Sequence, residues 1–282
     1  MPEGDTIFRT ARTLTRALAG QTVTRFETVL PTLARVDCDT PLAGRTVERV
    51  ESRGKWLLMH FSGDLILLSH MLMSGSWHIY RPGEKWQRHR SHMRIVVETP
   101  AMLAVAFDVP VAEFHSARSL ARRAGFNRLG PAPLAADFLP AVAIANLAAH
   151  PHLELGPALL DQTVLAGLGN VFKSEVAFAC GLNPFCRVAT LTAEDLAALV
   201  DTARQLLLAN VTPSSGHRRS TTGSTQKEEN LWVYGREGLP CRRCATPIRS
   251  QKHAADGRVS FWCPACQKTR DSHPISSALC RK

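Results

Sequence analysis

The chain lacks any long hydrophobic run. None of its uninterrupted apolar stretches approaches the roughly 18 residues that a helix needs to cross a bilayer. Its first residues also lack the apolar segment of a secretory signal. These absences argue against a helical membrane protein and against export. We expect a protein of the cytoplasm with no membrane partner.

A disulfide framework is also missing. Four of the eight cysteines are scattered through the sequence: Cys38, Cys180, Cys186 and Cys280. Scattered cysteines in a cytoplasmic protein are typical of buried or free thiols. Covalent cross-links are therefore not expected to hold the fold, and a chain of 282 residues is long enough for two domains with cores of their own.

Acidic residues are scarce at both ends of the chain. Lys and Arg outnumber Asp and Glu by 18 to 12 in residues 1–130 and by 13 to 5 in residues 216–282, whereas residues 131–215 have 3 against 7. No basic amphipathic helix stands out, so nucleic acid is favoured over a membrane surface as the anionic partner. Basic surfaces that face only solvent remain the alternative.

Short apolar runs dominate the first half of the chain. A helical pattern over residues 6–19 ends at Gly20, and short runs rich in Val, Leu, Ile and Phe then follow between residues 22 and 97, with one more at 102–109. Gly, Ser and Pro separate these runs. Their spacing predicts an antiparallel β-sandwich or barrel behind a leading helix.

The middle of the chain has helical patterns instead. They cover residues 135–149, 159–165 and 171–180, and a further helix is expected from a cap at Thr192, with Asp195 at its third position, to about Val211. Residues 213–229 are polar and rich in Gly, Ser and Thr, which predicts a mobile loop. The second domain is therefore expected to be helical.

The remaining four cysteines form a C-x2-C-x18-C-x2-C pattern: Cys241, Cys244, Cys263 and Cys266. Two such pairs offer four thiolates to one Zn²⁺, with the intervening residues as a β-hairpin. Because four cysteines complete the coordination shell, the metal would be structural and leave no position for a catalytic water. Two disulfides or redox pairs are the alternative.

Two further motifs suit an anionic ligand. Residues 167–170 (GLGN) lie between helical segments, so the next helix would direct free N–H groups and the Asn170 amide outward. Arg258 lies within the expected zinc hairpin, where its guanidinium could contact a phosphate. An ordinary helical turn and a solvent-exposed arginine explain the same residues without a ligand.

The N-terminal half contains three more candidate residues. If Met1 is removed, the Pro2 amine becomes a candidate nucleophile, since the reference pKa of an N-terminal amine is about 7.7–8.0, and Glu3 next to it is the nearest acid or base. Lys55 follows a Gly between two strands, and Met73 lies in the segment SHMLMSG, where a methionine can wedge into a base stack. A frayed terminus, a solvated lysine and a core methionine are the alternatives.

These motifs together resemble the formamidopyrimidine-DNA glycosylase/endonuclease VIII family of base-excision repair enzymes. The similarity rests on five segments in order: PEG at 2–4, RGK at 53–55, SHMLMSG at 69–75, LDQTVLAGLGNVFKSE at 160–175 and GRVSFWCPACQK at 257–268. They extend over nearly the whole chain. The sequence looks most similar to the endonuclease VIII branch found in actinobacteria.

The resemblance implies an α+β, two-lobed fold. An N-terminal β-sandwich lobe with a leading helix is expected over residues 1–130, and a helical lobe with a helix–two-turn–helix motif over 131–230. The four-cysteine zinc hairpin and a tail would occupy 231–282. The chain would act as a monomer on damaged double-stranded DNA, in the cytoplasm and at the nucleoid when bound.

The resemblance also implies the activity, a bifunctional DNA glycosylase and AP lyase. Pro2 would attack the sugar C1′, Glu3 would supply the acid and base steps, and Lys55 would contact phosphate and sugar. Asn170 and Arg258 would hold the phosphates around the lesion. Met73 would fill the space left by the flipped nucleotide.

The chain departs from the family pattern in three places. Asp5 and Thr6 replace the usual Pro-Glu, so a second carboxylate expected at residue 6 is missing. The Asp-Pro-Arg-Arg-Phe loop of the 8-oxoguanine branch is absent after Asp108, which favours oxidised pyrimidines as substrates. The wedge segment has Met73 where related enzymes have a bulkier aromatic residue, which leaves the preferred opposite base undetermined. A formamidopyrimidine- and 8-oxoguanine-specific glycosylase, and a zinc-finger protein that binds damaged DNA without cutting, are the alternatives.

Overall fold

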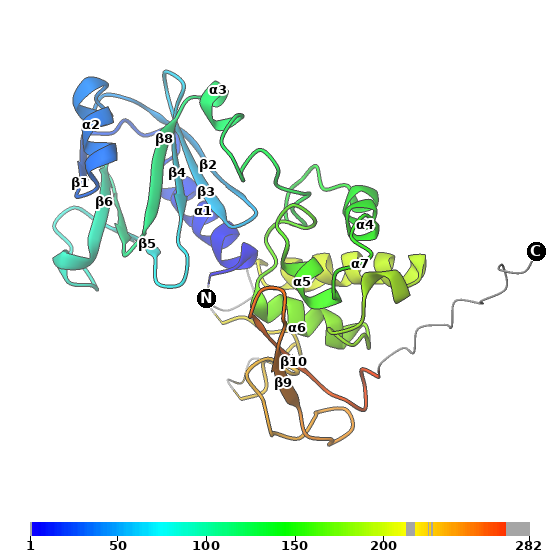
Figure 1. Ribbon diagram of the computed structural model, residues 1–282. Helices are drawn as coiled ribbons and strands as arrows, with labels where there is room; N and C mark the ends of the chain where they lie inside the picture. The colour runs from blue at the N-terminus through cyan, green and yellow to red at the C-terminus, as the bar shows by residue number, and fades with distance from the viewer. Residues whose placement is uncertain (1, 213–217, 225, 227, 269–282) are drawn as a thin grey trace, which may run out of the picture. The chain divides into compact units, whose positions relative to one another are not determined.

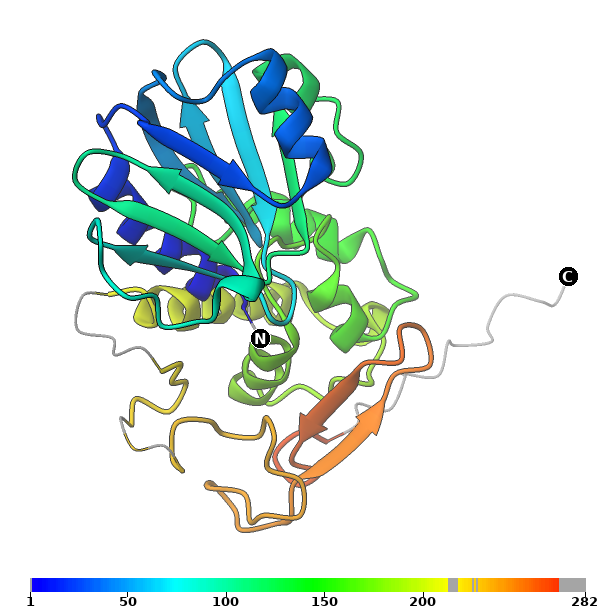
Figure 2. The same ribbon diagram turned by 90° about the vertical axis from the view of Figure 1, so that its left-hand side faces the viewer.

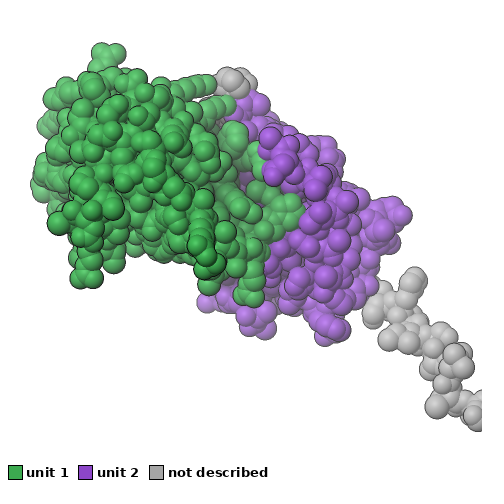
Figure 3. Space-filling model, turned by 90° about the horizontal axis from the view of Figure 1, so that it is seen from above, with its two compact units in different colours: residues 1–135 green, residues 136–282 purple. Residues whose placement is uncertain are grey.

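The computed structural model describes residues 2–212, 218–224, 226 and 228–268. The chain divides into two compact units, residues 1–135 and 136–282, which Figure 3 shows in different colours. The three-part division at residues 130 and 230 stays a prediction. Within the described residues, no helix is long and apolar enough to cross a membrane.

Unit 1 is a β-sandwich of two four-stranded antiparallel sheets (Figure 1). In the first sheet the strands follow the order β2 (Val47–Arg53), β3 (Trp56–Phe61), β4 (Leu65–His70) and β8 (Val111–His115). In the second the order is β1 (Arg25–Thr28), β6 (Met93–Glu98), β7 (Leu103–Phe107) and β5 (Ser76–Tyr80). The predicted α+β class with an N-terminal sandwich is thereby confirmed.

The two central strands of the first sheet, β3 and β4, are covered on both faces, which explains why they are almost continuously apolar. Leu57 and Leu67 face the core between the sheets, where they meet Ile95 and Ala106 of the second sheet. Their neighbours on the opposite face, Leu58, Ile66 and Leu68, pack against a second cluster with Leu120 and Phe126. Strands buried on both faces lose the alternation of apolar and polar residues.

The leading helix α1 (Gly4–Leu18) packs its apolar stripe into the core of the sandwich. Ile7, Ala11, Leu14 and Leu18 recur every three or four residues and are buried, as an amphipathic helix requires. The helix lies against β2, and Gly20 follows its end with a positive φ of 78°. The helix predicted over residues 6–19 is therefore confirmed, with slightly different ends.

Three elements of unit 1 were not anticipated. Helix α2 (Pro31–Asp39) buries only Leu33, so it has no apolar periodicity to reveal it. Strand β8 and the short helix α3 (Ala117–Leu120) follow the last strand expected from the sequence. Pro31 at the first helical position of α2 was the available signal, because proline is favoured there.

In its described residues, unit 2 contains four α-helices and the two-stranded hairpin (Figures 1 and 2). They are α4 (Pro140–Ala148), α5 (Leu155–Leu160), α6 (Asn170–Ala179), α7 (Ala193–Ala209), β9 (Arg249–Lys252) and β10 (Val259–Trp262). Short 3-10 turns occur at Arg90–His92 in unit 1 and at Val188–Thr190 in unit 2. The helical second domain and the hairpin between the cysteine pairs are confirmed.

The cap of α7 forms as the sequence indicates. The Asp195 N–H donates to the Thr192 hydroxyl at 3.2 Å, and the Thr192 N–H donates to the Asp195 carboxylate at 2.9 Å. Both side chains thus satisfy backbone groups that the helix leaves unpaired. The helix predicted from this cap to about Val211 ends at Ala209.

The prediction of a helix at residues 159–165 was wrong. The structure has α5 at Leu155–Leu160, followed by turns. Pro157 falls in the first turn of α5, where the backbone N–H that a proline lacks would have no partner within the helix. After the helix, the Asp161 carboxylate accepts the Thr163 N–H at 2.8 Å and begins a turn.

Two segments of the sequence fall wholly or largely outside the described residues. They are the loop predicted at 213–229 and the tail after residue 268.

Candidate functional site

The N-terminal carboxylates are buried at the start of α1. Glu3 is the N-cap residue of the helix, and its carbonyl accepts the Ile7 N–H at 3.1 Å. Glu3, the residue next to Pro2, has an exposed fraction of 0%. Its burial and its position next to Pro2 in the sequence keep Glu3 a candidate acid or base.

Asp5 occupies the first turn of the same helix and is also fully buried. Its carboxylate accepts the Thr6 hydroxyl at 3.3 Å and lies 3.8 Å from the Arg9 guanidinium. Since α1 begins at Gly4, this negative charge also lies close to the positive end of the helix dipole. A second carboxylate is therefore present in this turn at residue 5, although residue 6 is a threonine.

Lys55 lies in the two-residue turn between β2 and β3. Arg53 pairs with Trp56 across this hairpin, and Gly54 has a φ of 60°, which glycine adopts without strain. Trp56 is held beneath the Arg123 guanidinium, 4.3 Å from the ring centroid. The residue that follows Lys55 is therefore held both by strand pairing and by the Arg123 guanidinium.

His70 ends β4 directly across from Trp56. The two rings meet edge to face with centroids 4.8 Å apart, and the imidazole Nδ1 accepts the Leu72 N–H at 3.0 Å. Burial, together with the smaller effects of the Lys55 and Arg123 charges, lowers the pKa of His70 to about 4. A neutral imidazole can act as this acceptor, which anchors the start of the loop after β4.

The tip of that loop is apolar and exposed. Met71 is buried, whereas Leu72 is 47% and Met73 69% exposed. Leu72 has a φ of 46°, and Gly75 donates its N–H to the Met71 carbonyl at 2.8 Å to close the turn. Met73 is thus a surface residue and not a core methionine, and the exposed Leu72 lies beside it at the tip.

The turn at residues 167–169 precedes α6, which begins at Asn170. Gln162 braces this turn: its side-chain oxygen accepts the Gly167 N–H at 3.0 Å, and its amide donates to the Leu168 carbonyl at 3.1 Å. Gly167 has a φ of 105°. The sequence did not single out Gln162, although this residue lies within the segment 160–175 that resembles the family.

The Asn170 side chain has an unusual environment. Its Oδ1 is buried and has no hydrogen-bond partner among the residues that the structure describes. A buried amide end without a partner is costly, whichever of its two ends points there. Such a group is suited to a ligand that supplies the missing hydrogen bond.

Helix α6 also binds the hairpin that carries Arg258. The Lys173 ammonium donates to the Val259 carbonyl at 2.9 Å, and the Phe261 N–H donates to the Ser174 hydroxyl at 3.3 Å. Arg258 itself is exposed, with its N–H donating to the Asp256 carboxylate at 2.9 Å. The structure thus links the element that begins at Asn170 to the element that carries Arg258.

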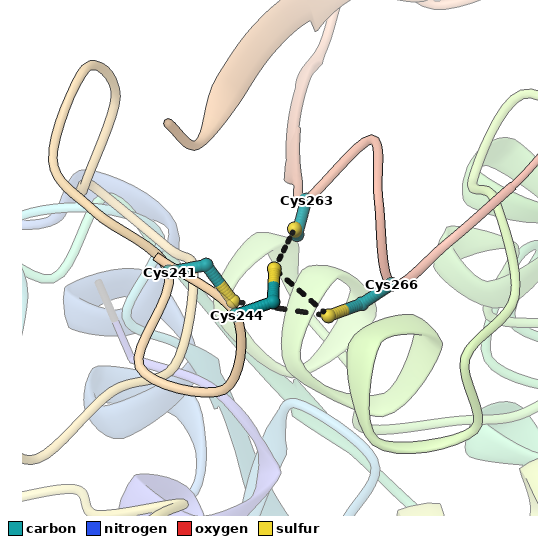
Figure 4. Close-up of side chains that lie close together, drawn as sticks. All are labelled: Cys241, Cys244, Cys263 and Cys266. Atoms are coloured by element: carbon teal, nitrogen blue, oxygen red, sulfur yellow. Dashed lines mark hydrogen bonds between the residues drawn. The ribbon is translucent and has the colours of Figure 1, made fainter. Parts of the chain in front are cut away.

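The four cysteines converge as Figure 4 shows. Their sulfur atoms all lie within 4.8 Å of one another, and three pairs are 3.4, 3.5 and 3.9 Å apart. A disulfide requires about 2.05 Å, whereas four thiolates about 2.3 Å from one Zn²⁺ lie roughly 3.8 Å apart. The donor set fits one structural zinc and argues against the disulfide alternative.

Three family models match consecutive parts of the chain. Residues 1–121 match the formamidopyrimidine-DNA glycosylase N-terminal domain, 129–221 its H2TH domain, and 238–269 the zinc finger found in FPG and IleRS. The second match contains the segment around Asn170, and the third contains all four clustered cysteines.

Curated relatives align over most of the chain. A "Probable endonuclease 8 2" of Streptomyces coelicolor is 41% identical over 95% of this chain and 94% of its own length. The "DNA-(apurinic or apyrimidinic site) lyase Nei2" of Mycolicibacterium smegmatis is 42% identical over 95% and 99% of the two chains. These matches span both units.

Solved structures share the fold. The Lactococcus lactis formamidopyrimidine-DNA glycosylase, in a complex with DNA that contains N7-benzyl-Fapy-dG, has a TM-score of 0.80 and 27% identity. The alignment covers 95% of this chain and 100% of that one. Matching domains, relatives and structure together lead to one conclusion: the chain belongs to the formamidopyrimidine-DNA glycosylase/endonuclease VIII family.

Proposed function

We propose that this protein removes oxidised pyrimidines from duplex DNA, with the Pro2 amine as its nucleophile. As a member of its family, the chain is a DNA glycosylase and AP lyase of base-excision repair. The observation that best supports the nucleophile is the complete burial of Glu3 next to Pro2. The nucleophile, the lesion class and the individual site residues are our proposal.

The reaction begins once Met1 has been removed. The lone pair of the Pro2 nitrogen forms a bond to the sugar C1′ as the bond between C1′ and the base breaks, and the proton that the Pro2 nitrogen then loses neutralises the departing base. Glu3 protonates the ring oxygen as the sugar opens, which leaves a positively charged iminium between Pro2 and C1′. The iminium acidifies the C2′ proton, and successive β- and δ-elimination then cut the strand on both sides of the sugar.

The substrate must be flipped out of the helix before this attack, at a cost of a few kcal/mol. Lys55, Asn170 and Arg258 would hold the phosphates around the lesion, and the buried orphan amide end of Asn170 supports a ligand there. Met73, exposed at its loop tip, would fill the vacated space. The zinc held by the four cysteines would stabilise the hairpin that presents Arg258.

The proposed preference for oxidised pyrimidines is supported by the short connection after β7. This strand ends at Phe107 and β8 begins at Val111, so Asp108, Val109 and Pro110 alone join them. The connection contains no arginine and no room for the arginine-bearing loop that the 8-oxoguanine branch has here. Action as a monomer in the cytoplasm stays a prediction.

Borohydride trapping tests the nucleophile. Duplex DNA with thymine glycol or an abasic site is incubated with the protein and borohydride, which should reduce the iminium to a stable covalent complex. The Pro2→Gly variant, with all lysines intact, should lose most of this complex. Full trapping by the variant would assign the reaction to another amine, and a wild-type protein that binds but never traps would favour the non-catalytic alternative.

The same assay tests the lesion class and Glu3. Base release from thymine glycol should exceed release from 8-oxoguanine, and the reverse order would favour the purine-specific alternative. Glu3→Gln should stop base removal more than it slows cleavage of a preformed abasic site, since the latter no longer needs the base to leave. Equal losses in both reactions would contradict the role proposed for Glu3.

A further inference from the structure

The zinc hairpin has a buried polar cluster at the end away from its cysteines. Arg258 precedes β10, and Cys263 follows it. Four strand residues span roughly 13 Å, so the metal lies far from Arg258. A two-stranded ribbon is marginally stable by itself. Contacts near the connecting loop must therefore fix the direction of Arg258.

His253 provides such contacts, in addition to the hydrogen bond from the Lys173 ammonium to the Val259 carbonyl. His253 directly follows β9, at the start of the connecting loop. Its N–H donates to the Arg258 carbonyl and its carbonyl accepts the Gly257 N–H, both at 3.0 Å. Its ring is 1% exposed, with Nδ1 2.5 Å from the Glu154 carboxylate and Nε2 2.6 Å from the Ser260 hydroxyl. One residue is thus bonded through its backbone to Arg258 and through its ring to the N-cap residue of α5.

The side chains of Glu154, His253 and Ser260 can satisfy one another as hydrogen-bond donors and acceptors. Burial lowers the pKa of His253, although the hydrogen bond to Glu154 opposes this and the charge of Lys173 adds to it. The neutral ring then donates from Nδ1 to Glu154 and accepts the Ser260 hydroxyl at Nε2. The Phe185 ring stacks on the imidazole with centroids 4.4 Å apart, which fixes the plane of the ring.

Gly156 makes room for this ring. A methyl group at residue 156 would lie 2.6 Å from Cε1 of His253 and 3.2 Å from the Ser260 hydroxyl. Real side chains do not approach so closely, so any larger residue would displace the imidazole. The first turn of α5 and the hairpin therefore fit each other only with glycine at this position.

We infer that Glu154, Gly156 and His253 form a latch that positions Arg258 by fixing the hairpin loop against α5. The contribution of Arg258 to DNA binding rests on the proposed function. The latch itself rests on contacts within unit 2. His253 is a positioning residue in this account, since it acts on the phosphate only through Arg258.

The latch is tested first without DNA, by amide hydrogen exchange in the zinc-loaded full-length protein. His253→Asn and Gly156→Ala should each speed exchange at the amides of His253 and Gly257. The exposed His152 offers a matched control, because His152→Asn should leave these amides unchanged. Unchanged exchange in both latch variants, with one zinc still bound per chain, would overturn the latch.

A double-mutant cycle then tests the effect on Arg258. Affinity is measured for duplex DNA with tetrahydrofuran, a stable abasic analogue. His253→Asn should weaken binding about tenfold in the wild-type background and less than about twofold beside Arg258→Ala. Equal losses in both backgrounds, or no loss in either, would overturn the positioning role.

Conservative substitution separates positioning from general damage. Glu154→Gln keeps an oxygen acceptor for the His253 ring and should retain near wild-type affinity, whereas Glu154→Ala should lose about as much as His253→Asn. With Arg258→Ala weakening binding, equal affinities of the two Glu154 variants would contradict the positioning of Arg258 by the latch. Should Arg258→Ala leave affinity unchanged while the latch variants still exchange faster, the phosphate role of Arg258 fails and the latch stands.

Discussion

Single polar side chains define both halves of the proposed site. Glu3 and Asp5 are buried at the start of α1, His70 anchors the exposed loop tip, and Asn170 keeps a buried amide end without a partner among the described residues. Burial is costly for polar groups, so most of these residues reduce stability unless bonded. Buried polar groups of this kind are typical of functional sites, where they are kept although they reduce stability.

His70 makes stability depend on pH. Its pKa of about 4 in the folded protein lies below its ordinary value of 6.5 because burial and the charges of Lys55 and Arg123 disfavour the imidazolium. The unfolded chain therefore binds more protons between these two values. We expect the unfolding free energy to fall as the pH drops below about 6.5, and this loss to level off below about 4.

Urea unfolding measured across this pH range checks the His70 prediction. His70→Asn should show a flatter dependence on pH than the wild type, since the titrating group is absent. His89→Asn is a suitable control because His89 is exposed. Parallel curves for the wild type and His70→Asn would show that another group is responsible.

Among the elements, helix α6 organises unit 2. It begins at Asn170 and binds the hairpin through Lys173 and Ser174. Its fully buried Glu175 accepts the backbone N–H groups of residues 232, 233 and 234 at 2.8, 2.9 and 2.8 Å, and also the Thr221 hydroxyl. One helix thus holds the hairpin and the segment before the zinc site in a single arrangement.

Glu175→Gln tests this role of α6. The amide keeps one acceptor oxygen but directs an NH₂ group at backbone donors, so buried N–H groups lose their partners. We expect a loss of about 1–3 kcal/mol in unfolding free energy. Glu237→Gln, an exposed substitution in the same segment, should change it by less than about 0.5 kcal/mol. Equal stabilities of the two variants, from denaturant titration, would contradict the prediction.

At the scale of the whole molecule, each unit contains a hydrophobic cluster made of its own residues. The sandwich core is made of residues from unit 1 alone, and the cluster around the cysteines contains Phe178, Val233 and Ile248 of unit 2. Zinc binding stabilises small elements that cannot bury a core themselves. Loss of the metal should therefore affect the units differently.

Zinc removal provides the corresponding test. Protein stripped with a chelator should show faster amide exchange in residues 241–266, while strands β3, β4 and β7 keep their protection. Its affinity for tetrahydrofuran-containing DNA should fall, because the hairpin no longer presents Arg258. Addition of Zn²⁺ should restore both properties. Unchanged affinity in demonstrably metal-free protein would exclude a role for the zinc hairpin in binding.

Much of the fold was predictable because local patterns carried it. The stripe of Ile7, Leu14 and Leu18 identified α1, the Thr192 and Asp195 cap identified the start of α7, and the cysteine spacing identified the zinc site. Helix α2 was missed because it buries only Leu33, and α5 was misplaced because a proline usually interrupts a helical pattern, whereas Pro157 falls in the first turn, where it is tolerated. In β3 and β4, burial on both faces also removed the alternation of apolar and polar residues that identifies a half-buried strand.

The sequence by itself determined the family, the zinc ligands and the candidate site residues, because each depends on residue type and spacing along the chain. Only the tertiary structure decided which of these residues are buried and what they contact. Glu3 and Asp5 are buried, Met73 is exposed, and Glu154 meets His253 at a separation of 99 residues. Contacts between residues so distant in sequence leave no periodic signal, since they depend on how separate elements pack.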